Sequence, residues 1–180
     1  MIYSNISLEK EPNNEEFLIQ RSRIYIELNA YQKGIKDLSN ALSANKTNPI
    51  VFYRRGLAFY KNRDYLAAIK DLEESLLHSP SRNIQADIYY HMGIAHSNLE
   101  EFDLAIEPLS KAIEIDPIPR YYHERAKCEI LLDKNEEALK DLNEVIEQQP
   151  ENAFAFFRRG FAHKALKKYD EAAEDFMKAR

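Results

Sequence analysis

The sequence predicts an all-α protein made of repeated helix pairs, and three observations support this fold class. Between Pro49 and Pro80, apolar residues recur at three- and four-residue steps in two runs separated by KNRDY, which indicates two amphipathic helices joined by a turn. The same pattern occurs in five copies, at intervals of about 34 residues. Only 4 of the 180 residues are glycine, and abundant alanine, leucine, glutamate and lysine favour helix.

The five copies define the register of the chain. We expect repeats at residues 15–48, 49–82, 86–118, 119–152 and 153–180, after a loose N-terminal arm at 1–14. Residues 83–85 are extra in this register. One place in the first helix of each repeat is always small, which lets the two helices approach closely: Ser22, Gly56, Gly93, Ala126 and Gly160.

The unit resembles the tetratricopeptide repeat. The residues that carry the resemblance in the second copy are Phe52, Arg55, Gly56, Phe59, Ala68, Leu72 and Pro80. The resemblance covers about residues 15–180 and implies a right-handed α-solenoid, in which each helix pair buries its apolar face against its neighbours. In this family a polar helix usually caps the last repeat. None follows Arg180, so we expect either a piece of a longer protein or a last helix that a partner covers.

A charged pair recurs with the repeats. An arginine directly precedes the small residue in four repeats, and an aspartate occupies one place in the second helix of the same four: Arg21, Arg55, Arg125 and Arg159 with Asp37, Asp71, Asp141 and Asp175. The third repeat replaces both partners, with Met92 and Pro108. Their joint loss predicts an arginine–carboxylate bridge between the two helices. Pro108 also predicts a kink in its helix.

Composition excludes several classes of protein. The net charge of −5 argues against a general nucleic-acid binder, which normally carries a basic stripe. A single cysteine, Cys128, excludes an internal disulfide framework and fits a reducing compartment. The sequence shows neither a signal peptide nor an apolar run long enough to span a membrane. We therefore expect an intracellular, cytoplasmic protein with no nucleic-acid or membrane partner.

No residue pattern indicates an enzyme. His91 and His96 are five residues apart and fall on different helix faces, as do His123 and Cys128, so neither pair forms a metal or nucleophile site. The four scattered glycines cannot form a phosphate-binding loop. The sequence therefore predicts no catalytic residue, no metal site and no cofactor.

Function is therefore expected on a surface. In the family that the sequence resembles, the first helices line a concave groove that holds a partner peptide. The places that face this groove carry many large apolar, aromatic and basic side chains, and the predicted binding residues are Tyr53, Arg54, Leu57, Tyr90, His91, Ile94, His123, Lys127, Phe157, Arg158 and Phe161. An alternative is that some of them fill gaps between adjacent helices.

Charge on the groove predicts the ligand. The resemblance implies that seven cations face the groove: Arg23, Arg54, Lys61, Arg120, Lys127, Arg158 and Lys164. Four anions oppose them, Glu16, Glu27, Asp87 and Glu124. This excess favours a peptide or helix with acidic groups beside apolar anchors.

The predicted function is a non-enzymatic protein–protein interaction scaffold. One alternative is a structural spacer that self-associates through its uncapped C-terminal repeat. A less favoured alternative is a co-chaperone, because the lysines and asparagines of the family's carboxylate clamp are missing: Ile19, Arg23, Arg54, Asp87 and His91 stand in those places. An unusual clamp made of Arg54, Arg120 and Arg158 remains open.

Overall fold

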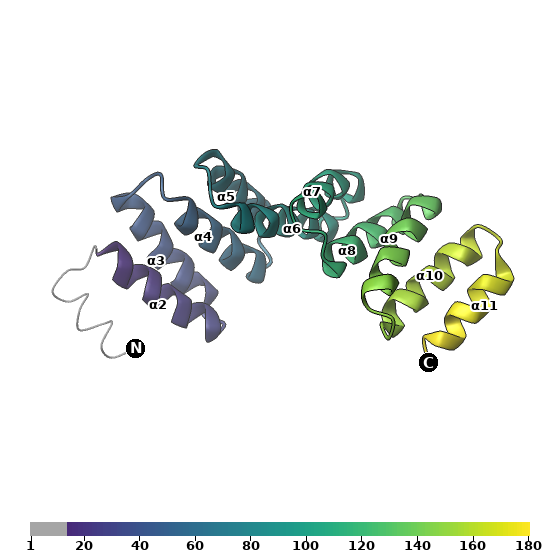
Figure 1. Cartoon of the computed structure of the whole chain (residues 1–180). Coiled ribbons are helices and arrows are strands. Elements are labelled where there is room, and N and C mark those ends of the chain that lie inside the picture. Colours follow the sequence, from purple (N-terminus) through teal and green to yellow (C-terminus); the bar gives the residue numbers. More distant parts are fainter. Residues whose placement is uncertain (1–13) are drawn as a thin grey trace. The chain divides into compact units, whose positions relative to one another are not determined.

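The computed structural model describes residues 14–180, and this part of the chain contains ten α-helices and no strand (Figure 1). The first helices of the pairs, called A helices below, are α2 (Glu15–Glu27), α4 (Pro49–Lys61), α6 (Arg82–Asn98), α8 (Pro119–Leu131) and α10 (Ala153–Ala165). The second helices, called B helices, are α3 (Tyr31–Ala44), α5 (Tyr65–Leu77), α7 (Phe102–Ile115), α9 (Asn135–Gln148) and α11 (Tyr169–Lys178).

Four helices begin after a residue whose side chain caps them. Asn14, Asn48, Asp64 and Asn152 each accept a hydrogen bond from a backbone N–H of the helix that follows. Proline stands in the first turn of α4 and of α8, where its missing N–H costs nothing. The predicted arm at 1–14 lies outside the described residues except for Asn14, which caps α2.

The turns between A and B helices share one conformation. Each contains a single residue with positive φ, between 57° and 64°: Asn29, Arg63, Glu100, Asp133 and Lys167. The N–H of the following residue donates back into the last turn of the A helix, for example from Asp64 to the Phe59 carbonyl at 2.9 Å. This is the Schellman closure, which satisfies helix-end carbonyls and reverses the chain in a few residues.

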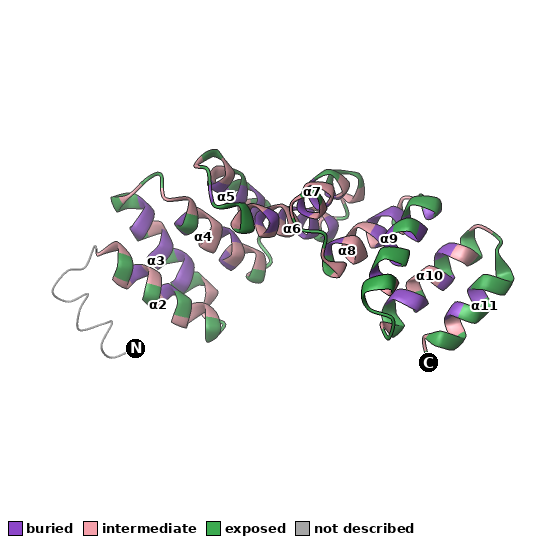
Figure 2. Ribbon diagram, viewed as in Figure 1, coloured by how far each residue is buried: buried purple, intermediate pink, exposed green. Residues whose placement is uncertain are grey.

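The described chain divides into two compact units between His91 and Met92, so the division falls inside α6. In each unit, buried apolar residues lie along the facing sides of the helices, and exposed residues alternate with them along each helix (Figure 2). The core of the first unit includes Leu18, Leu38 and Val51, and that of the second includes Leu142 and Val145. Each helix therefore packs through one amphipathic face.

The extra residues 83–85 are helical, because α6 begins at Arg82 and is longer than the other A helices. The insertion therefore lengthens a helix. The helix α7 continues through Pro108, which is buried in it. The predicted kink at Pro108 stays a prediction.

The predicted arginine–aspartate bridges are confirmed in all four repeats that carry them. In each, the guanidinium donates two hydrogen bonds to one carboxylate, with N–O distances between 2.6 and 2.9 Å. The aspartates are nearly inaccessible to solvent. Three of the arginines use a further nitrogen to reach the B helix of the preceding repeat, where Arg55 meets Ser39, Arg125 meets Ser110 and Arg159 meets Asn143. Each of these arginines therefore fixes its A helix to two B helices.

Candidate functional site

The predicted binding residues lie on A helices of both units. In the first unit these are Tyr53, Arg54 and Leu57 on α4 and Tyr90 and His91 on α6. In the second unit they are Ile94 on α6, His123 and Lys127 on α8, and Phe157, Arg158 and Phe161 on α10.

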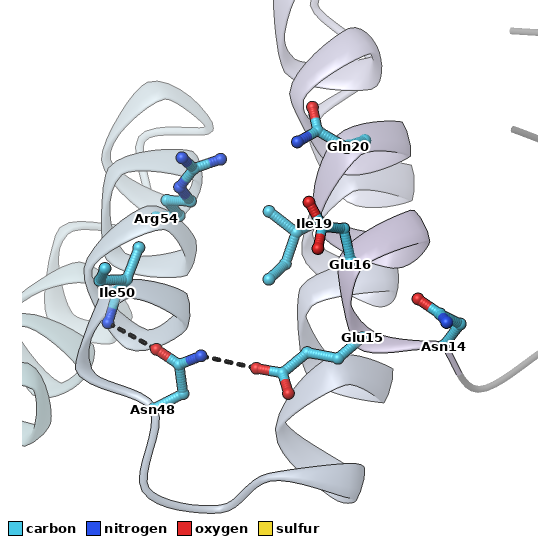
Figure 3. Close-up of a pocket in the computed structure, with 8 residues that line it drawn as sticks. All are labelled: Asn14, Glu15, Glu16, Ile19, Gln20, Asn48, Ile50 and Arg54. Atoms are coloured by element: carbon cyan, nitrogen blue, oxygen red, sulfur yellow. Dashed lines mark hydrogen bonds between the residues drawn. The ribbon is translucent and has the colours of Figure 1, made fainter.

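Two cavities lie between α2 and α4 in the first unit. The first cavity, of about 540 Å³, lies at the N-terminal ends of the two helices and is lined by Asn14, Glu15, Glu16, Ile19, Gln20, Asn48, Ile50 and Arg54 (Figure 3). The second cavity, of about 310 Å³, lies farther along the helices and is lined by Ser22, Arg23, Ile26, Glu27, Tyr53, Arg54, Leu57 and Lys61. Arg54 belongs to both walls.

A hydrogen-bond network connects α4 to α6 beside these cavities. The Tyr53 hydroxyl donates to the Asp87 carboxylate. The Nδ1 atom of His91 lies 3.1 Å from the same carboxylate and 2.8 Å from the Asp87 carbonyl oxygen. The His91 ring also meets the ring of Tyr60 edge to face. Tyr53 and His91 therefore hold adjacent A helices together, which is the gap-filling role left open as the alternative.

The second unit displays an aromatic strip on α10, defined as Phe154, Phe157 and Phe161. Their side chains are 55%, 45% and 45% exposed. The ring centroids of Phe154 and Phe157 are 6.5 Å apart, and those of Phe157 and Phe161 are 4.9 Å apart. Phe176 of α11 supports the strip from below through ring contacts with Phe157 and Phe161. The three rings thus form one continuous exposed surface.

A basic and an imidazole group border this strip. The Arg158 guanidinium lies 4.9 Å from the centroid of the Phe154 ring, a cation–π distance, and has no ion pair among residues 14–180. Burial lowers the pKa of Arg158. His123 stacks on Phe154 with ring centroids 5.2 Å apart. Burial, with a smaller effect of the Arg158 charge, lowers the pKa of His123 to about 4, so that His123 is neutral at pH 7.

Two predicted residues are less available. Ile94 is buried, with 8% of its surface exposed. Lys127 lies 3.5 Å from Glu124 in an ion pair on α8. Both remain predictions as binding residues.

Two residues that matter to these surfaces were not among the predicted binding residues. Phe154 is an exposed member of the strip, and Asp87 receives the Tyr53 bond. The repeat register could have identified both residues. Counted from the first residue of each repeat, the fifth residue of one repeat contacts the second residue of the next, as Tyr53 contacts Asp87 and His123 contacts Phe154. Ile19 and Ile50 occupy the same two places and line one cavity.

Metal binding, thiol reactivity and membrane insertion would depend on the acidic, histidine and cysteine side chains and on the apolar helices of residues 14–180. Among residues 14–180 no group of three or more histidine, cysteine or acidic side chains is arranged to hold a metal ion. Cys128 is fully buried, as expected for a packed residue, and burial raises the pKa of its thiol. None of the helices in this part of the chain has the length and apolar character needed to cross a membrane.

Known proteins share this repeat and this fold. Family models described as tetratricopeptide repeat match residues 86–118, 19–84 and 132–180. The crystal structure of YrrB, described as a TPR protein with an unusual peptide-binding site, superposes with a TM-score of 0.84 at 21% identity and covers 98% of this chain and 90% of YrrB. A crystal structure of MamA gives 0.85 at 19% identity, over 92% and 89%. The predicted all-α solenoid fold is confirmed.

The chain also resembles parts of longer proteins. Heat shock protein STI1 of Saccharomyces cerevisiae is 35% identical over 99 residues, which cover 54% of this chain and 17% of STI1. The DnaJ homolog subfamily C member 7 homolog of Dictyostelium discoideum is 22% identical over 187 residues, covering 96% and 35%. The Hsp70-Hsp90 organizing protein of Triticum aestivum is 24% identical over 206 residues, covering 95% and 36%. The chain spans about a third or less of the length of these three relatives.

The repeated helix pairs, the shared turns and the arginine–aspartate bridges thus agree with the matches of the family models along most of the sequence. The chain belongs to the tetratricopeptide repeat family.

Proposed function

We propose that this chain is a non-enzymatic protein-interaction scaffold that binds a peptide segment or helix of a partner protein on the faces of its A helices. The observation that carries the proposal is the aromatic strip of α10, three contiguous phenylalanine rings that are each about half exposed. Contiguous exposed apolar surface of this kind usually marks a binding site, and aromatic residues are enriched at interfaces.

Charge beside the strip supports a partner with acidic residues. Arg158 is half-buried, stacks on Phe154 and has no ion pair among the described residues. A carboxylate from a partner would compensate the cost of keeping this cation out of water. We propose one set of binding residues in each unit. In the first unit these are Tyr53, Arg54, Leu57, Tyr90 and His91, and in the second they are His123, Lys127, Phe157, Arg158 and Phe161.

The comparisons add a general argument. YrrB is described as having a peptide-binding site, and one relative is named an Hsp70-Hsp90 organizing protein. Both descriptions concern partners that are proteins or peptides. The family's usual carboxylate clamp is absent from this sequence, so the proposal extends to protein binding and not to a particular chaperone.

The test is a peptide-display screen with the wild-type chain and with a Phe157→Ala/Phe161→Ala variant. We expect the wild type to enrich peptides with apolar and acidic residues, and the variant to lose at least tenfold in affinity for them, because aromatic anchors dominate such interfaces. A Leu66→Ala/Leu77→Ala variant is the matched control, since it removes two exposed leucines from α5. Thermal melts would establish that all three chains fold.

The spacer function makes a different prediction. In the second and fourth repeats the fifth residue, Tyr53 or His123, contacts the next repeat, whereas Phe157, the fifth residue of the last repeat, remains 45% exposed. If the strip serves assembly, sedimentation will show association that depends on concentration and on Phe157 and Phe161, with no enriched peptide. That result would contradict the proposed scaffold.

A further inference from the structure

Arg54 stands between the two cavities of the first unit and is available to a ligand. Neither an ion pair nor a hydrogen bond engages its guanidinium within residues 14–180. The neighbouring Arg21 and Arg55 are both committed to buried aspartates. Arg54 is partly buried, and its side chain lies between α4 and α2 (Figure 3).

The acidic residues around Arg54 do not neutralise it. Glu15 accepts hydrogen bonds from Asn48 at 2.6 Å and from Asn45 at 3.5 Å. Glu27 pairs with Arg23 at 3.6 Å. Glu16 lines the first cavity and is exposed, but it forms no ion pair with Arg54. A carboxylate from outside is therefore the missing partner for this guanidinium, whose planar fork suits a carboxylate.

Apolar walls lie on both sides of Arg54. In the first cavity, Ile19 of α2 faces Ile50 and Arg54 of α4 (Figure 3). In the second cavity, Ile26 and Leu57 supply the corresponding apolar surface, with Arg23 and Lys61 at its edge. A ligand anchored at Arg54 can therefore place one apolar group in each cavity.

We infer that the space between α2 and α4 is a subsite for an internal aspartate or glutamate of a partner segment that carries an apolar side chain on each side of the acid. This inference rests on the proposed function, because it names the kind of segment that one A-helix surface accepts. A chain-terminal carboxylate would leave one of the two cavities empty, and an internal acid fills both.

Charge and spacing narrow the ligand further. The second cavity is lined by three cations and one anion, whereas the first adds two glutamates to the shared Arg54. A phosphate group would bring about two negative charges toward Glu16, so a single carboxylate fits better. Ile50 and Leu57 lie four residues before and three residues after Arg54, which is about 6 and 5 Å along a helix. An extended segment covers these distances in about two residues.

The probe is a capped peptide in a glycine–serine background, with a central aspartate and a leucine two residues away on each side. Three companion peptides replace the aspartate with asparagine, replace it with phosphoserine, or end at the aspartate with a free carboxylate. Fluorescence anisotropy would measure the affinity of each for the wild-type chain, for Arg54→Gln and for Arg82→Gln. Arg82 is an exposed arginine at the start of α6 and serves as the matched control.

We expect Arg54→Gln to weaken binding of the aspartate peptide by about tenfold, the effect of one lost charge-assisted contact. The asparagine peptide should bind weakly and equally to all three chains, and Arg82→Gln should match the wild type. Equal affinities of the wild type and Arg54→Gln for the aspartate peptide, or no binding of that peptide, would overturn the inference. So would tighter binding of the phosphoserine or the free-carboxylate peptide.

A Phe157→Ala/Phe161→Ala chain separates this inference from the proposed function. If the aspartate peptide binds that chain as it binds the wild type, the Arg54 subsite stands whatever the fate of the aromatic strip. If the display peptides need the aromatic strip, but the aspartate peptide binds the wild type and Arg54→Gln with equal affinity, the proposed function stands and the inference fails.

Discussion

At the scale of single residues, the arginine–aspartate bridges determine how each repeat closes. The carboxylates of Asp37, Asp71, Asp141 and Asp175 are almost inaccessible, and each receives two charge-assisted hydrogen bonds. A buried carboxylate without its partner is costly, whereas removing both charges together is often tolerated. The third repeat, with Met92 and Pro108 at these places, is a natural example of the double replacement.

This asymmetry gives a prediction for the second repeat. We expect Arg55→Met to cost about 3 kcal/mol of unfolding free energy, because Asp71 stays buried without its cation. The Arg55→Met/Asp71→Leu double variant should cost less than Arg55→Met alone. Urea unfolding of the two variants and of Asp71→Leu completes the cycle. Additive costs would mean that the two side chains act independently.

Glu129 is a second buried acid, but without a close partner. It is 6% exposed, and its Oε1 atom lies 4.0 Å from Nε of Arg125, which is already bonded to Asp141. Its Oε2 atom forms no hydrogen bond within the described chain. Burial, and next the charge of Asp141, raise the pKa of Glu129 to about 7. The folded protein therefore favours the protonated acid more than the unfolded chain does.

A pH dependence follows from this raised pKa. The stabilising contribution of protonated Glu129 is fully present below about pH 4.5 and is lost as the pH rises through about 7. Glu129→Gln keeps the shape and stays neutral, so its stability relative to the wild type should increase by on the order of 2 kcal/mol between pH 5 and pH 8. Melting curves of both proteins across this range would show the change. A constant difference would place the Glu129 pKa near its ordinary value.

At the scale of helices, close approach within a repeat depends on the small residue of the A helix. A Cβ added at Gly93 would lie 2.5 Å from Cγ of Leu109, and one added at Gly56 would lie 3.0 Å from Cγ of Leu72. At Gly160 the nearest atom is in the ring of Phe176, at 2.7 Å. Ala126 fills the same place in the fourth repeat, so a methyl group is accepted only where the B helix leaves room.

We expect Gly93→Ala to destabilise the protein by about 1–3 kcal/mol, because overpacking against Leu109 exceeds the helix propensity that alanine gains. Gly56→Ala should be closer to neutral, since its clash is milder. Thermal and urea unfolding of the two variants would rank them. A more stable Gly93→Ala would show that Leu109 moves freely and that the helices do not need glycine there.

The A helices also divide their exposed faces between packing and binding. Tyr53 and His123 were expected to face a ligand, and the structure gives both of them contacts with the next A helix. From the same predicted set, Phe161 is 45% exposed, and Arg54 is partly exposed and forms no ion pair within residues 14–180. A predicted helix face does not distinguish a side chain that contacts a neighbouring helix from one that contacts water.

At the scale of the whole molecule, fold and surface are specified by different residues. YrrB and MamA share the fold with about one residue in five identical. Patterned small and apolar places suffice to stack helix pairs. The residues proposed to bind, such as Arg54, Phe157 and Phe161, lie outside the repeat pattern, and one fold can therefore carry many partners.

The sequence by itself determined the helix pairs and the arginine–aspartate bridges. Each of these depends on contacts between places that recur along the chain, so the helix pairs are seen in five copies and the bridges in four. The joint replacement by Met92 and Pro108 in the third repeat identifies the two partners from the sequence alone.

Only the tertiary structure decided which A-helix residues remain open. The cavities on either side of Arg54, the burial of Ile94 and the stacking of Phe154 on His123 depend on side chains from two repeats at once. So does the environment of Glu129, since its pKa depends on burial and on a charge from another helix. Each of these features depends on neighbouring side chains, and these differ from repeat to repeat. The periodicity of the sequence describes only what the repeats have in common and therefore cannot predict such features.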